Sequence, residues 1–334
     1  MILVTGGLGF IGSHIALSLM AQGQQVVIVD NLSNSDLKNL KRLEYISGMS
    51  IPFAKVDIRN TPALLNVIQQ YSVRSVVHAA GFKSLEESIM KPLEYYNSNV
   101  SCIMSLLRAM QRSGIRNLMH LSSLAVYGKS DAHLTEDEPF NYEFNNPYVK
   151  SQQMIEQIIK DTFITDPEWN ITILRIGNVA GAYENTILGE VVDPLPKNII
   201  PLAMQVASGE RDFLELRLDA DTEDKTVERS FLHVLDVCTA VSFAIQWLYQ
   251  QGHVLEIFNI AGALTSMHEL VKTIANVTEK QIPILEARNF DSIELAQLGS
   301  DSQKAQDVLN WKPIRTIEQM IVDEWKYYQI QLSD

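Results

Sequence analysis

Residues 1–30 read MILVTGGLGFIGSHIALSLMAQGQQVVIVD, and this stretch decides the fold. Residues 2–5 are a short apolar run with β-branched side chains, and a loop with four glycines follows it. From Ser13 the apolar spacing becomes helical, and a second β-branched run at residues 26–29 ends on Asp30. This pattern predicts a strand, a glycine-rich loop, a helix and a second strand closed by an acid.

That order of elements is typical of a site for a dinucleotide. Gly6, Gly9 and Gly12 allow the backbone to approach a pyrophosphate, and the helix N-terminus supplies unpaired N–H groups and the positive end of its dipole. An acid about 20 residues further on binds the 2′-hydroxyl of an adenosine ribose and repels a 2′-phosphate. With Asp30 in that place we expect NAD rather than NADP. The alternative, a glycine-rich turn without a ligand, fits the strand-to-helix context poorly.

The composition is that of an ordinary soluble enzyme. The chain has 334 residues, of which 46% are apolar, and is long enough for two domains. No apolar run approaches the roughly 20 residues that span a bilayer, and no basic region precedes the first one, so we expect no signal peptide. Cys102 and Cys238 suggest neither disulfides nor a metal site, which favours a cytoplasmic location. The net charge of −13 argues against nucleic acid or an anionic membrane as partner.

Strand and helix patterns continue to alternate after Asp30. Strands are expected at residues 51–56, 75–80, 117–122 and 171–176, and helices at 100–113 and 149–161. This alternation predicts an α/β fold with a doubly wound parallel (Rossmann) sheet. The rhythm loosens beyond Asn178, so we expect an NAD-binding domain over 1–176 and a smaller α/β substrate-binding lobe over 177–334. Some segments of the second part are expected to return to the first domain, and the lobe to cover the carboxyl edge of the sheet, where ligands of such folds bind.

Polar residues follow several of these strands. Asp57 follows the strand at 51–56, where it could reach an adenine or cap a helix that begins at Thr61, and the sequence leaves both open. Ser123 follows a strand and Tyr148 begins a helix, so the two hydroxyls can converge on one substrate hydroxyl, with the tyrosine as acid or base and the serine holding the oxygen. His120 is a rival acid or base, but within an apolar strand we expect a satisfied core histidine.

Several segments together resemble the extended short-chain dehydrogenase/reductases, with the closest likeness to UDP-hexose 4-epimerases. They are TGGLGFIGSH, DNLSNS, DIRN, AGFKSLEESIMKPLEYYNSNV, SSLAVYG, NPYVKSQQMIEQI, LRIGNVAGAY, RSFLHVLDV and LNWKP. The resemblance covers essentially the whole chain. It implies an isomerase in which a tightly held NAD oxidises C4 of a UDP-sugar, the 4-keto sugar rotates, and reduction occurs on its other face. It also implies a homodimer built on the helices near 100–113 and 149–161, and no metal.

The resemblance assigns roles residue by residue. For catalysis it points to Ser123 and Tyr148, with Gln152 at the family's lysine position. For the cofactor it points to Gly6, Gly9, Phe10, Ile11, Gly12, Asp30, Asn31, Asn34, Asp57, Ile58, Ala79, Ala80, Lys83 and Asn99. For the substrate it points to Lys83, Ser123, Tyr148, Asn178, Asn198, Arg229, Arg288, Asp291 and Leu298.

The two arginines suit a diphosphate because a guanidinium binds phosphate oxygens in a bidentate fork. For Arg229 and Arg288 the alternative is a surface ion pair with their acidic neighbours Glu228 and Glu286. Without the resemblance we would prefer that alternative.

One departure from the family pattern concerns catalysis. The family has Tyr-x-x-x-Lys, whereas this chain has Tyr148-x-x-x-Gln152, and Lys150 lies on the far side of a helix. Glutamine can still bond the ribose hydroxyls of the cofactor, but it supplies no positive charge to lower the pKa of Tyr148. Lys83 offsets part of that loss if it points inward. We therefore expect slowed redox chemistry.

Two further departures concern the sugar. Gly177 stands where these epimerases usually carry an aromatic residue near the nicotinamide, and Leu298 aligns loosely with the residue beside the sugar. A side chain of that size is compatible with an N-acetylated hexose.

Three interpretations remain, and an active 4-epimerase comes first. The second is a silent protein that binds NAD and a nucleotide sugar. The third is a related nucleotide-sugar enzyme; the dehydratases carry an Asp-Glu pair where this chain has Leu124-Ala125.

Overall fold

The computed structural model of the chain describes residues 1–144, 146–184, 187–191, 196, 198–287 and 295–333. Its main sheet is parallel throughout, with seven strands in the order β10-β6-β5-β4-β1-β2-β3. The strands are β1 (Ile2–Thr5), β2 (Val26–Asp30), β3 (Phe53–Lys55), β4 (Ser75–His78), β5 (Asn117–Ser123), β6 (Asn170–Ile176) and β10 (Val254–Ile260). The predicted doubly wound sheet is therefore confirmed.

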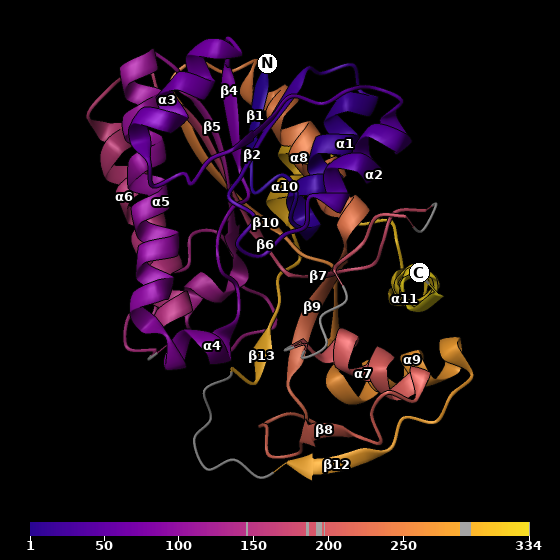
Figure 1. Ribbon diagram of the computed structural model, residues 1–334. Helices are drawn as coiled ribbons and strands as arrows, with labels where there is room; N and C mark the ends of the chain where they lie inside the picture. The colour runs from indigo at the N-terminus through magenta and orange to yellow at the C-terminus, as the bar shows by residue number, and fades with distance from the viewer. Residues whose placement is uncertain (145, 185–186, 192–195, 197, 288–294, 334) are drawn as a thin grey trace.

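Helices cover both faces of this sheet (Figure 1). One face carries α1 (Phe10–Ala21), α2 (Lys38–Ser47), α8 (Val234–Leu248) and α10 (Gln303–Leu309), and the other α3 (Thr61–Gln70), α5 (Pro92–Ser113) and α6 (Pro147–Ile164). Successive side chains of a strand enter opposite cores, so that Leu3 packs with α3 and α5 while Val4 packs with α1 and α8. Burial on both sides explains why these strands read as continuous apolar runs.

A smaller lobe lies beyond the carboxyl ends of the main strands (Figure 1). Its mixed sheet is centred on β9 (Glu228–His233), which pairs with β7 (Asn178–Ala180), β11 (Ala263–Ser266) and β13 (Gln297–Leu298). A separate parallel pair is formed by β8 (Leu214–Arg217) and β12 (Ile284–Ala287). A third apolar core joins β8 of this pair to α7 (Ile199–Ser208), α9 (Met267–Thr278) and α11 (Ile317–Ser333).

The second part of the chain contributes to both layers. Helix α8 packs against α1, and β10 pairs with β6 over the register Val254–Asn170 to Ile260–Ile176, so both belong to the main sheet. We propose that the first domain comprises the chain up to the end of β6, near residue 176. Helix α8 and strand β10, from the second part of the chain, are then also part of the first domain.

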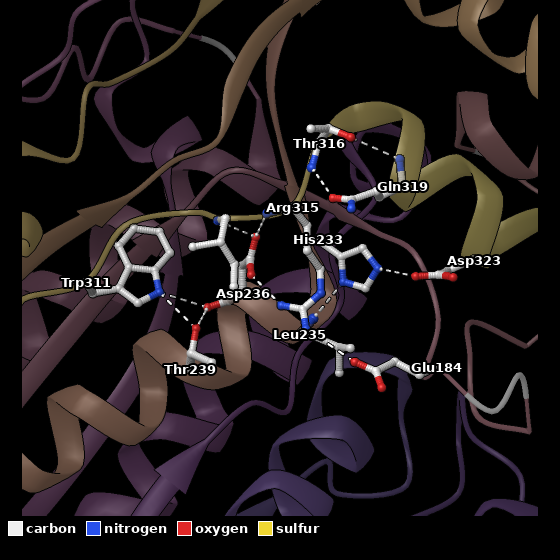
Figure 2. A network of polar contacts seen from close by, with 11 residues as sticks. Glu184, His233, Leu235, Asp236, Thr239, Trp311, Arg315, Thr316, Gln319 and Asp323 are labelled. Atoms are coloured by element: carbon white, nitrogen blue, oxygen red, sulfur yellow. Dashed lines mark hydrogen bonds and ion pairs between the residues drawn. The ribbon is translucent and has the colours of Figure 1, made fainter.

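A polar network fastens the C-terminal segment to α8 (Figure 2). The buried carboxylate of Asp236 accepts hydrogen bonds from the side chain of Arg315 at 2.7 Å and from its backbone N–H at 3.0 Å. Trp311 donates from Nε1 to the carbonyl of Asp236 and to the hydroxyl of Thr239, each at 3.1 Å. Asp236 belongs to the segment RSFLHVLDV and Trp311 to LNWKP. The contacts between these two segments therefore stabilise the fold.

Several elements differ from the sequence prediction. Helix α5 begins at Pro92 instead of Val100, because proline is well tolerated at the first position of a helix. A short helix, α4 (Leu85–Met90), precedes it, and α2 was not predicted. The edge strand β3 covers only residues 53–55. Within the described residues, none of the helices has an apolar stretch of the length that a bilayer crossing requires.

Candidate active site

A cavity of about 420 Å³ separates the carboxyl edge of the main sheet from the smaller lobe. Its walls come from Ile11 in the first turn of α1, the segments after β4 and β5, helix α6, the start of α7, and β7, β8 and β9 of the lobe. Loops at the carboxyl ends of parallel strands converge at this edge, which is where open α/β sheets bind ligands.

The glycine loop, residues 6–12, exposes backbone atoms without side chains near one end of the cavity. Gly6 has φ +65°, and a Cβ there would lie 2.8 Å from the Cα of Ala80. A Cβ on Gly12 would lie 2.1 Å from the carbonyl oxygen of Gly6, so helix α1 can approach the loop only with glycine at that position. The carboxylate of Asp30 accepts a hydrogen bond from the N–H of Leu8 at 3.1 Å and is thereby held against the loop.

The other predicted cofactor residues are distributed as follows. Ile11, Ala79, Ala80, Lys83 and Asn99 line the cavity. Phe10 lies beneath the ammonium group of Lys83, with 5.7 Å between Nζ and the ring centroid. Gly9 opens helix α1 as its N-cap, Asn34 is exposed and Ile58 is buried.

Asp57 does not cap helix α3, so that interpretation is wrong. Asn60 is the cap, with its side chain accepting from the N–H of Ala63 at 3.1 Å. Asp57 instead pairs with Arg59 at 2.6 Å and accepts from the amide of Asn31 at 3.3 Å. The hydrogen bond from Arg59 is the main reason that the pKa of Asp57 is lowered to about 2.

Ser123 and Tyr148 meet at the wall of the cavity. Ser123 is the last residue of β5, and Tyr148 stands in the first turn of α6, which Asn146 caps by accepting from the N–H of Val149 at 3.2 Å. Burial raises the pKa of Tyr148, and a hydrogen bond with Ser123 opposes that rise. The two hydroxyls therefore face one space in which a substrate oxygen can sit between them.

Gln152 lies one helical turn after Tyr148 and lines the same cavity. It is 7% exposed, and none of the described residues donates a hydrogen bond to its Oε1. Lys150 is not among the cavity residues. A chain of bonds fixes this part of α6, because Asn99 donates to the hydroxyl of Ser151 at 3.0 Å and Ser151 donates to the carbonyl of Tyr148 at 2.7 Å.

His120 is not the satisfied core histidine that the sequence suggested. His120 is one of the cavity residues, and its ring stacks on the ring of His78 with 5.4 Å between centroids. Within the described part of the chain neither ring nitrogen of His120 has a hydrogen-bond partner. Burial lowers the pKa of His120 to about 3, so the ring is neutral.

Lys83 points into the cavity but is already paired. Its Nζ lies 2.7 Å from a carboxylate oxygen of Glu190. Glu324 of α11 lines the cavity nearby and accepts from the N–H of Gly181 at 2.8 Å, and burial together with Glu190 raises the pKa of Glu324 to about 8. Sequence reasoning missed both acids because no local pattern links residues so far apart in the chain.

The lobe supplies the other wall. Asn178, Asn198, Arg229 and Leu298 all line the cavity, and Arg229 is 6% exposed and donates to the carbonyl of Leu295 at 2.7 Å. Arg288 and Asp291 lie outside the described residues. Arg217 on β8 is a second arginine of this wall, and no motif in the sequence marks it.

Gly177 also lines the cavity, and its lack of a side chain is required by packing. A Cβ there would lie 2.6 Å from the carbonyl oxygen of Ser230 on β9. The close approach of β9 therefore leaves no room for a side chain at this position, and the aromatic residue that is usual in the family is excluded.

The chain matches the model of the NAD dependent epimerase/dehydratase family over residues 2–261, and it belongs to that family. Among its relatives are proteins named UDP-glucose 4-epimerase. The one from Dictyostelium discoideum is 37% identical over 336 residues, covering 98% of this chain and 96% of that protein. The one from Pasteurella multocida (strain Pm70) is 36% identical over 330 residues, with the same coverage.

Solved structures agree with this assignment. UDP-glucose-4-epimerase from Stenotrophomonas maltophila, with bound NAD and formylated UDP-arabinopyranose, superposes with a TM-score of 0.94 at 33% identity, covering 99% of this chain and 98% of that chain. The enzyme from Bifidobacterium longum, in complex with NAD⁺ and UDP, gives 0.94 at 31% identity with the same coverage. The predicted family and the fold with a smaller second lobe are confirmed.

Proposed function

We propose that this chain is an NAD-dependent UDP-hexose 4-epimerase that interconverts UDP-glucose and UDP-galactose or their N-acetyl forms. The observation that carries the proposal is the meeting of Ser123 and Tyr148 in a cavity that begins beside a dinucleotide loop. The names of the relatives and the ligands in the neighbouring structures support the same activity.

The residues present fit NAD. Gly6 and Gly12 let the loop fold tightly against Ala80 and the start of α1, and Asp30 is held beside this loop, where it would bind ribose hydroxyls and repel a 2′-phosphate. The unpartnered Oε1 of Gln152 and the cavity-lining Asn99 fit the nicotinamide end. When bound, NAD supplies the oxidation of C4 of the sugar and its subsequent reduction.

In this proposal Tyr148 removes the proton of the 4-hydroxyl and later returns it. The hydroxyl of Ser123 holds the same oxygen and keeps it in reach of the phenol. The 4-keto sugar must then turn so that its other face is reduced, and Gly177 forms part of the cavity wall.

The substrate diphosphate is assigned to the lobe. Arg229 supplies positive charge, and Asn178 and Asn198 supply amide groups on the same wall. By family resemblance Arg288 and Asp291 complete this set, and Leu298 lies beside the sugar. We propose both plain and N-acetylated hexoses as candidate substrates.

We propose a homodimer and a cytoplasmic location from the family resemblance, and exposed apolar side chains on α5 and α6 support the homodimer. Met154 of α6 and Leu93 of α5 are exposed, with 45% and 79% of their surface accessible. A homodimer built on α5 and α6 would cover apolar side chains of this kind. We propose a cytoplasmic enzyme.

The test is conversion of UDP-galactose and of UDP-N-acetylgalactosamine by the full chain and by Tyr148→Phe. Tyr142→Phe is the matched control, because Tyr142 is 62% exposed. We expect turnover by the parent chain and the control, and a loss of at least about 100-fold in Tyr148→Phe, the usual size of an acid–base contribution. Equal rates in all three proteins would refute the role of Tyr148.

A second candidate is a protein that binds NAD and a nucleotide sugar without turnover, and the neutral Gln152 is the observation that favours it. It predicts bound NAD and protection by UDP, with no conversion of either sugar. The dehydratase alternative is disfavoured because Leu124 and Ala125, which follow Ser123, are apolar and buried.

A further inference from the structure

Two residues of the cavity wall have buried polar side-chain atoms without hydrogen-bond partners among the described residues. His120 is 3% exposed and Gln152 is 7% exposed. Both ring nitrogens of His120 and the Oε1 of Gln152 are without partners among the described residues. Each buried polar atom that lacks a hydrogen bond costs about 1–3 kcal/mol of stability. We therefore expect a state of the protein in which these atoms have hydrogen-bond partners.

The fold brings these two side chains to one wall. His120 and Ser122 alternate onto the same face of β5, and Ser122 donates to Glu156 of α6 at 2.7 Å. Gln152 precedes Glu156 by four residues and therefore lies on the same face of α6. This bond holds the side of β5 that carries His120 against the side of α6 that carries Gln152, and both residues line the cavity.

The chemistry of the two groups is complementary. A neutral imidazole has one N–H donor, and the amide of Gln152 has an oxygen acceptor and an N–H₂ donor. An amide whose oxygen is held by a donor must direct its N–H₂ the other way. In that orientation glutamine offers donors, as the lysine of the family pattern does, although without its charge.

We propose that, when NAD is bound, Gln152 turns so that its Oε1 accepts a hydrogen bond from the ring N–H of His120 while its N–H₂ donates to the nicotinamide ribose. His120 is thus a positioning residue that acts through Gln152, and the pair is this chain's neutral replacement for the lysine. The inference rests on the proposed function for the identity of the ligand, but it is tested by binding and stability rather than by turnover.

The test compares His120→Phe, Gln152→Met and the double variant. Phenylalanine keeps a ring on His78, and methionine keeps the length of the glutamine side chain. The matched control is Thr172→Val on β6, which also removes a buried hydroxyl without a partner in the described structure but lies outside the cavity. Each protein is freed of nucleotide, its NAD affinity is measured by calorimetry, and its thermal unfolding is recorded with and without NAD.

We expect each single cavity variant to weaken NAD binding about threefold to tenfold, which is the worth of one hydrogen bond. The double variant should bind NAD no more weakly than the worse single variant. His120→Phe and Thr172→Val should unfold without NAD at a temperature equal to or above that of the parent. Unchanged NAD affinity in His120→Phe, additive losses in the double variant, or a lower unfolding temperature of nucleotide-free His120→Phe would each overturn the proposal.

Discussion

Gln152→Lys should increase the rate of epimerisation at neutral pH by about 10-fold to 1,000-fold. Tyr148 must lose its proton to act as a base, and burial raises its pKa above the ordinary value of 10.0. At pH 7 less than about 0.1% of such a tyrosine is ionised. A cation one helical turn away lowers an acid's pKa by about 1–3 units, and each unit multiplies the ionised fraction tenfold.

The assay is the initial rate on UDP-galactose from about pH 7 to about pH 10, a range below the pKa of Tyr148. For the parent chain the rate should rise about tenfold per pH unit, since the base form increases in that proportion. For Gln152→Lys the rate should be higher at pH 7 and should begin to level off at a lower pH than in the parent chain. Gln157→Lys, on the exposed side of the same helix, is the control for added charge. An unchanged pH profile in a Gln152→Lys protein that still binds NAD would refute this reasoning.

Three further predictions concern packing and charge. Gly12→Ala places a Cβ 2.1 Å from a backbone oxygen and should abolish NAD binding by calorimetry, whereas Gly252→Ala, with open space around it, should not. Glu156→Gln should lower the free energy of unfolding in urea by about 3–5 kcal/mol. In the parent chain the buried Arg175 lies 2.7 Å from the carboxylate of Glu156, and the variant leaves this arginine without its counter-charge. Glu324 has a pKa raised from 4.5 to about 8, so the folded state binds more protons than the unfolded state between these values. Stability should therefore fall as the pH rises from 4.5 to about 8, and Glu324→Gln should remove that part of the slope.

The main sheet could be predicted because its signals are local. Each parallel strand is buried on both faces, so its apolar run is visible without knowledge of its neighbours. The glycine loop and Asp30 lie within 30 consecutive residues, and their spacing within a strand–loop–helix–strand pattern indicates a dinucleotide site. The pairing of Ser123 with Tyr148 follows from the same logic, since one ends a strand and the other begins the next helix.

The rest depends on contacts between distant parts of the chain. Lys83 and Glu190 are 107 residues apart, and Glu324 meets Gly181 across 143 residues, so no window of sequence reveals these groups. His120 looked like a satisfied core residue because a strand pattern reports burial and not hydrogen bonding. Gly177 looked like a lost aromatic residue, whereas the approach of Ser230 from β9 is what requires glycine there.

In the proposed reaction epimerisation proceeds by oxidation and reduction at C4 within one site. The most direct measurement is conversion of UDP-galactose by the NAD-loaded chain in deuterated water, followed by NMR of the sugar C4 position. We predict UDP-glucose whose C4 hydrogen comes from the substrate, with no deuterium from the solvent. Product labelled with deuterium at C4, or no product from a protein that retains NAD, would contradict the account.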